Sequence, residues 1–225
     1  MKGFVGFLLI FVLLAACQGS EIAAPDIPDY FPLAKGVYQI YDVQSKQYLS
    51  TAVKELTYEM KAEVIDSFPS GDTYTYVIHR STRSSSNESW TALDTWSVRR
   101  DHPEIIVMEG NTPFVKMSAP YIHENVWDGN AYNNLGKDDY VLQEVDVPLD
   151  LNGKSFGKTL TVQQEWNDDP IVYRDQREEI YAGGVGLIYK RIIQLHYCTN
   201  DACLGQQRVE EGTEMTMVIK QYGKL

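Results

Sequence analysis

Alternating positions in two stretches of the chain predict β-strands. In TYTYVIHR, residues 73–80, aromatic and β-branched residues follow a period of two with strand-forming residues on both faces. In VGLIYKRIIQLHY, residues 185–197, the same period places Leu187 on one face and Ile188 and Ile192 on the other. We therefore expect a strand over each of these two ranges.

Turn-forming residues divide the rest of the chain into similar segments. No stretch of about twelve residues or more has a persuasive amphipathic helical repeat. The pattern predicts a mainly β fold, with about ten or eleven strands in an antiparallel meander that forms a curved sheet, a half-barrel or a sandwich with little helix. The turn signals are Pro69–Gly71, Gly110–Asn111, Asp128–Asn130, Asn152–Gly153 and Gly183–Gly184.

The first residues have the pattern of an export signal. Residues 3–16 are apolar or small and follow Lys2, but this run is shorter than the roughly 20 residues that a membrane-spanning helix needs. A positive start, an apolar centre and the small pair Ala15-Ala16 are typical of a signal peptide that is cleaved. We expect residues 1–16 to be removed.

The segment LAAC, residues 14–17, resembles the lipobox of bacterial lipoproteins. This resemblance implies that the Cys17 thiol receives a diacylglycerol and that Cys17 becomes the acylated N-terminus, with palmitate among its acyl chains. Several acyl chains give stable membrane anchoring, whereas one chain binds only marginally. Residue 18 is Gln rather than Asp, so the familiar inner-membrane retention signal is absent, and we expect the protein in the cell envelope, anchored in the outer membrane.

The remaining roughly 200 residues suffice for one sizeable all-β domain. Residues 17–29 are mostly polar and contain proline, as expected of a flexible tether, and residues 30–225 are expected to form a single β-rich domain. The formal net charge of −11 repels phosphate backbones, which argues against a nucleic-acid partner.

The three cysteines have separate predicted roles. Once Cys17 is acylated, Cys198 and Cys203 remain as an even pair in an oxidising compartment, where a disulfide is expected. The turn-rich quartet TNDA lies between them, so the bond would staple a hairpin loop. A metal site would need more soft ligands nearby, and only His196 is close in sequence.

Three longer segments resemble an uncharacterised family of Gram-negative bacterial outer-membrane lipoproteins. They are DYFPLAKGVYQIYDV (29–43), VKMSAPYIHENVWDGNAYN (115–133) and YAGGVGLIYKRIIQLHYCTNDACLGQ (181–206). Gln39 stands where the family commonly has an aromatic residue, and His123-Glu124 where a glycine is usual. The family has no established activity, so the resemblance implies a location and an architecture but no reaction.

Several motifs suggest chemistry but lack the expected context. GKSFG, residues 153–157, matches the nucleophile elbow around Ser155, but a strand-forming segment follows where the elbow needs a helix.

The acidic doublets, such as Glu178-Glu179, are expected to be solvated surface charges. Calcium at Asp128–Asn130 would need further oxygen ligands. The histidines stand singly at His79, His102, His123 and His196. We predict no catalytic residue, no cofactor and no metal site.

Aromatic residues make up 12% of the chain. Such residues fill β cores, and a surplus on a concave face would suit an apolar ligand. The function expected first is therefore a non-enzymatic, membrane-anchored binding module for an apolar ligand or a partner protein. A structural or assembly role in the envelope and, last, a hydrolase are the alternatives.

Overall fold

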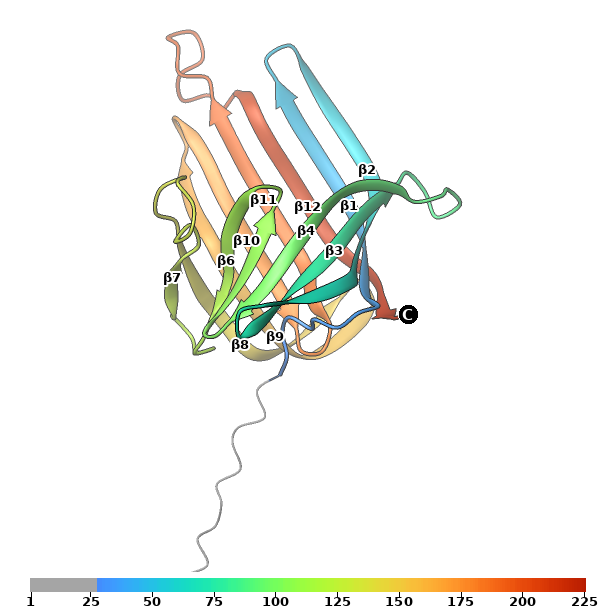
Figure 1. Ribbon diagram of the computed structural model, residues 1–225. Coiled ribbons are helices and arrows are strands. Elements are labelled where there is room, and N and C mark those ends of the chain that lie inside the picture. The colour runs from blue at the N-terminus through green and yellow to red at the C-terminus, as the bar shows by residue number, and fades with distance from the viewer. Residues whose placement is uncertain (1–27) are drawn as a thin grey trace, which may run out of the picture.

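The computed structural model describes residues 28–225, which form one twelve-stranded antiparallel sheet (Figure 1). The expectations for the signal peptide, for Cys17 and for nearly all of the tether lie outside the described residues. The strands are β1 (Val37–Leu49), β2 (Ala52–Ser70), β3 (Thr73–Arg83), β4 (Thr91–Asp101), β5 (Glu104–Glu109), β6 (Thr112–Ser118), β7 (Val126–Asp128), β8 (Asp139–Leu151), β9 (Lys154–Asp169), β10 (Tyr173–Ala182), β11 (Gly186–Tyr197) and β12 (Val209–Lys224).

The first and last strands pair in the middle of the sheet. The strand order is β6-β5-β4-β3-β2-β1-β12-β11-β10-β9-β8-β7, so each half of the chain forms a meander that runs outward from the β1–β12 pair. The backbone N–H of Leu225 donates to the Gly36 carbonyl at 2.9 Å, and the C-terminus therefore lies beside the start of β1 (Figure 1).

The sheet curls until its two halves face each other. Figure 1 shows β3–β6 crossing in front of β8–β12, and a shared core confirms that these layers are packed together. Curling lets a two-sided apolar sheet bury one face against itself, which a flat sheet of this length cannot do. The core between β4–β6 and β8–β10 includes Val98, Ile106, Val115, Met117, Leu142, Leu160 and Val162.

The two edges of the curled sheet meet at a seam formed by β6 and residues 127–133. Trp127 Nε1 donates to the Val115 carbonyl at 2.8 Å, and the Val115 N–H donates to the Gly129 carbonyl at 2.9 Å. The Tyr140 ring fills the position where a Cβ on residue 129 would lie, so glycine is required there. The Trp-Asp-Gly-Asn segment thus joins the sheet edges.

The β8–β9 hairpin bends back toward the centre of the sheet. Its turn residue Asn152 donates through Nδ2 to the Ile219 carbonyl at 3.3 Å on β12. Three register shifts interrupt the β8–β9 ladder, and such bulges increase bending and twist. Phe156 of this hairpin joins a second core, with Val43, Ile188, Met217 and Ile219.

The predicted fold class is confirmed: the described residues form an all-β antiparallel meander in a curved, nearly closed sheet with no helix. The sheet has twelve strands, slightly more than expected, because short strands such as β7 carry little periodic signal. The predicted breaks at Gly71, Gly110, Gly153 and Gly184 all lie in hairpin turns.

One face assignment was wrong. Leu187 and Ile192 were expected on opposite faces of their strand, but both line the same internal cavity. The β10–β11 register pairs Ile180 with Tyr189 and Tyr181 with Leu187, so residue 188 is the extra residue of a bulge. Beyond a bulge, each side chain points to the face opposite to the one that strict alternation predicts. A strict period of two therefore assigns the wrong face to residues on one side of the bulge.

No helix among residues 28–225 has the length and apolar character needed to cross a membrane.

Candidate functional site

A cavity of about 300 Å³ lies between the two halves of the sheet. Its volume is at the lower end of the range for small-molecule pockets, which runs from about 300 to 1,000 Å³. Most of its lining is apolar, and residues of nine strands contribute. Representative apolar lining residues are Tyr58, Met60, Ile78, Trp96, Leu187 and Met217.

Residues 28–36, here called the strap, close one end of this cavity. Phe31, Pro32 and Leu33 of the strap line the cavity. Arg100 holds the strap through its Nη2, which donates to the Asp29 carboxylate at 2.8 Å and to the Phe31 carbonyl at 2.7 Å. The first family-like segment therefore forms a wall of the cavity.

The glycines of the YAGGVG segment make room for the strap. A Cβ on Gly183 would lie 2.7 Å from the Pro28 Cβ, closer than side chains approach. Gly186 has φ +95°, and a Cβ there would lie 3.2 Å from Gln39 Nε2 and 3.4 Å from Pro32 Cδ. A left-handed φ favours glycine. Gly186 is therefore required for two reasons: its backbone conformation, and the lack of room for a side chain at this position.

Four charged side chains from both halves of the sheet meet at the cavity wall. Lys116 Nζ of β6 lies 2.7 Å from Glu109 Oε1 of β5 and 3.3 Å from Glu179 Oε1 of β10. Lys190 Nζ of β11 lies 2.7 Å from the same Glu179 oxygen. The Tyr181 hydroxyl donates to Glu179 Oε2 at 2.5 Å. This charged cluster therefore links the two facing layers.

Glu179 and Lys116 of the charged cluster stay ionised despite their burial. Burial alone would raise the pKa of Glu179, but Lys116 and Lys190 outweigh it and hold the pKa well below the usual range. Burial alone would lower the pKa of Lys116, but Glu179 and Glu109 raise it above its usual value. Two ammonium groups and two carboxylates balance one another, and breaking such a buried set is costly.

Arg80 is a fifth charged residue at the cavity. Its guanidinium carbon lies 3.7 Å from the centre of the Trp96 ring, a cation–π stack. Its Nε lies 3.2 Å from Asp94 Oδ1, and burial lowers the pKa of Arg80. Both Arg80 and Trp96 line the cavity, whereas Asp94 does not.

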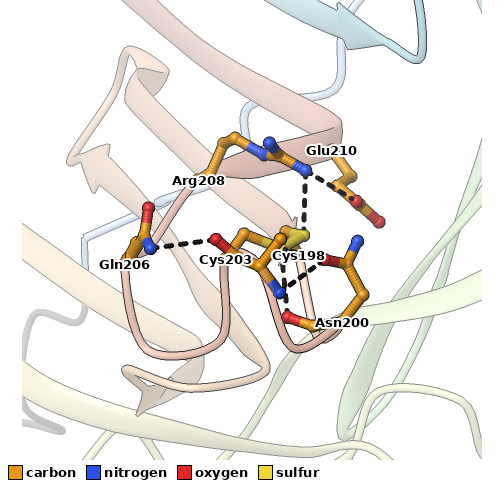
Figure 2. Close-up of a disulfide and its surroundings, with 7 residues drawn as sticks. Cys198, Asn200, Cys203, Gln206, Arg208 and Glu210 are labelled. Atoms are coloured by element: carbon orange, nitrogen blue, oxygen red, sulfur yellow. Dashed lines mark hydrogen bonds and ion pairs between the residues drawn. A yellow bond between two sulfur atoms is a disulfide. The ribbon is translucent and has the colours of Figure 1, made fainter.

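The disulfide lies away from the cavity, in the loop between β11 and β12 (Figure 2). Cys198 and Cys203 are bonded, with their Cα atoms 5.8 Å apart. The Asn200 side chain accepts from the Ala202 N–H at 3.1 Å, and Arg208 Nη2 contacts Cys198 Sγ at 3.0 Å (Figure 2). The loop is therefore stapled and supported by its own polar side chains.

Cys198, Cys203 and Glu210 form a group of potential metal ligands within residues 28–225. The two sulfur atoms are bonded to each other, and metal binding requires thiolates. Glu210 also pairs with Arg208 at 3.6 Å. We assign a structural role to this group.

Ser155 lies at the start of β9, directly after a hairpin turn. Its hydroxyl donates to Asp150 Oδ1 at 2.5 Å, across the same hairpin. A nucleophile elbow requires a strand followed by a helix, and here the motif joins two strands.

The other candidates for chemistry lie apart from the cavity. Asp128 Oδ1 accepts from the backbone N–H groups of Asn130 and Asp138, so it serves the seam loop. His123 is exposed, and its Nδ1 lies 2.7 Å from the Gln143 carbonyl. None of these residues lines the cavity.

Sequence reasoning missed the charged cluster. The Glu178-Glu179 doublet was expected to be solvated, which is wrong for Glu179, whose side chain is only 2% exposed. Lys116 carried a signal, because it interrupts the apolar run PFVKM, residues 113–117, and a charge inside such a run needs a buried partner. Glu109 and Lys190 gave no comparable signal, since their partners are distant in sequence.

No protein-family model matches this chain, and no curated protein matches its sequence. Two solved structures are similar to it. One is a protein from Bacteroides fragilis, described as exported and as having a YmcC-like fold, with 10% identity, a TM-score of 0.48, and coverage of 86% of this chain and 98% of that one. The other is described as a lipoprotein from Parabacteroides distasonis, with 11% identity, a TM-score of 0.43, and coverage of 88% and 100%. Likenesses at this level assign no function to this chain.

Proposed function

We propose that this chain is a lipoprotein anchored in the outer membrane through Cys17, and that its β-domain binds an apolar ligand without catalysing a reaction. The observation that carries the binding proposal is the cavity of about 300 Å³ between the sheet halves. Its lining is mostly apolar and rich in aromatic side chains, as a site for an apolar molecule should be. The lipobox at residues 14–17 supports the anchor.

The charged cluster fits a structural role better than a catalytic one. Its two carboxylates and two ammonium groups are already paired at 2.7 to 3.3 Å, so none is left as a free acid or base. The cluster fixes the spacing of the two facing layers and so keeps the cavity open. We therefore propose that binding, not turnover, is the activity of this site.

Titration with an apolar fluorophore tests the binding proposal. The full chain should bind the fluorophore saturably, and acyl chains should displace it. No hydrolysis of ester, peptide or glycoside substrates is expected, and Ser155→Ala should leave binding unaltered. Turnover that Ser155→Ala abolishes would replace the binding module with a hydrolase, and absence of both binding and turnover would favour an assembly role in the envelope.

Labelling with palmitate tests the anchor. The wild-type chain should incorporate the label and fractionate with the outer membrane. Cys17→Ala should incorporate none, because the acylated thiol is missing. Equal labelling of the two proteins would contradict the lipoprotein assignment and leave the cavity proposal untouched.

A further inference from the structure

The cavity contains one cation whose counterion lies outside it. Glu109, Lys116, Glu179 and Lys190 compensate one another within the cavity wall. Arg80 pairs instead with Asp94, whose side chain is 41% exposed and does not line the cavity. The charged groups that line the cavity therefore have an excess of one positive charge, and Arg80 supplies it.

The Arg80 guanidinium is incompletely bonded. Its Nε is buried and has no hydrogen-bond partner among the described residues, although Asp94 Oδ1 is 3.2 Å away. A buried donor without a partner is rare in folded proteins and requires an explanation. The stack on Trp96 at 3.7 Å holds the guanidinium at the cavity wall but supplies no acceptor.

We propose, building on the binding function above, that the ligand is a single alkyl chain ending in one anionic head group, a carboxylate or a phosphate monoester. The head group accepts hydrogen bonds from the Arg80 guanidinium, and the chain lies along the apolar wall formed by residues such as Met60, Leu187 and Met217. The planar guanidinium matches both anions geometrically, and a charge-assisted hydrogen bond is strong where water is excluded.

Competition among amphiphiles of one chain length tests this head-group preference. An apolar fluorophore bound to the full chain is displaced by dodecanoate, dodecyl phosphate, dodecanol or dodecyltrimethylammonium. At least one anion should displace it about tenfold better than dodecanol, which corresponds to one charge-assisted hydrogen bond. The ammonium compound should be the weakest competitor. Comparison of the two anions identifies carboxylate or phosphate as the better head group.

Substitutions at Arg80 and Asp94 assign the preference to one side chain. Arg80→Gln should abolish the advantage of the anion over dodecanol, while binding of the neutral fluorophore persists. Asp94→Asn should increase the advantage, because Arg80 loses its competing counterion. Arg99→Gln is the matched control, since this arginine on β4 is 43% exposed, does not line the cavity and should leave the advantage unchanged.

The outcomes separate this inference from the binding function. Equal displacement by anion and alcohol, or a preference that Arg80→Gln retains, overturns the head-group proposal while the cavity still binds. Failure of the fluorophore to bind at all overturns the binding function itself. If Arg80→Gln does not fold, Asp94→Asn, at an exposed position, still tests the proposal. An unchanged preference for the anion in Asp94→Asn would contradict the proposal.

Discussion

The Trp127 indole donates a hydrogen bond from Nε1 to the Val115 carbonyl at 2.8 Å, and this bond joins the two edges of the sheet. The Val115 N–H is also occupied, by the Gly129 carbonyl at 2.9 Å. Open strand edges invite pairing with other chains, so a seam that covers them protects the fold. The same seam keeps the facing layers together around the cavity.

Trp127→Phe should loosen this seam. The ring is buried, so phenylalanine retains much of the packing but leaves the Val115 carbonyl without its indole partner. We expect a loss of about 1 to 3 kcal/mol in the free energy of unfolding, the usual range for an unsatisfied buried group. Amide exchange should quicken in β6 and β7. Trp166→Phe, at a side chain that is half exposed, is the control and should change neither quantity appreciably.

Gly186→Ala should displace the strap. Gly186 has φ +95°, and its added Cβ would press on Gln39 and Pro32, so we expect a loss of about 1 to 3 kcal/mol. Gly157→Ala is the matched control, because its Cβ would meet open space. Chemical denaturation measures both changes. Equal stability of the two variants would contradict the role given to Gly186.

Glu59 should make the free energy of unfolding depend on pH in the acidic range. This carboxylate is 5% exposed and accepts hydrogen bonds from Lys220 at 2.5 Å, Arg83 at 2.6 Å and Ser86 at 2.9 Å. Burial alone would raise its pKa, but these three partners lower the pKa from 4.5 to about 2. A lowered folded-state pKa stabilises the protein above the unfolded-state pKa, so this stabilisation is lost as pH falls from 4.5 toward 2.

Unfolding of Glu59→Gln between pH 7 and pH 2 measures this dependence. The variant should be less stable than wild type near neutrality and should lose less stability on acidification. Glu55→Gln is the control, because its side chain is 73% exposed and its loss should leave the acid profile unchanged. Parallel profiles for wild type and Glu59→Gln would exclude Glu59 as a source of the acid sensitivity.

The Cys198–Cys203 disulfide should contribute modestly to stability. The bond closes a loop with a sequence separation of 5, and a loop this short restricts the unfolded chain by roughly 2 kcal/mol. Cys198→Ser should lower the free energy of unfolding by about that amount without abolishing folding. The native chain should show no thiol from this pair until a reductant is added. Two thiols that react in the native oxidised protein would contradict the bond.

Local signals predicted the elements of the fold better than their arrangement. Periodicity and turn residues located hairpins such as the one around Gly153, because both depend on residues that are adjacent in sequence. The bulge at Ile188 gave no such signal, and it moved Leu187 to the face that lines the cavity. The seam between Val115 and Trp127 depends on how far the whole sheet curls, which no local pattern specifies.

The sequence predicted the kind of site, a concave apolar surface, but not the contacts that form it. The aromatic content indicated a concave apolar face, and Tyr58 and Trp96 do line the cavity. The pairing of Lys116 with Glu179 joins residues 63 positions apart on facing layers. Such contacts follow from the register and curvature of the sheet, so their partners could not be assigned from the sequence.

Filling the cavity with a side chain is the most direct test that it is the binding site. Ala62 lines the cavity, and Ala62→Phe should place a ring inside it, whereas Ala92→Phe adds the same ring at an exposed position on β4. Fluorophore titrations of the full chain and both variants, each checked for an unfolding transition close to that of wild type, give the comparison. We expect Ala62→Phe to weaken binding at least about tenfold, a loss of about 1.4 kcal/mol, and Ala92→Phe to bind as wild type does. Equal binding by all three folded proteins would contradict the claim that the cavity binds the ligand.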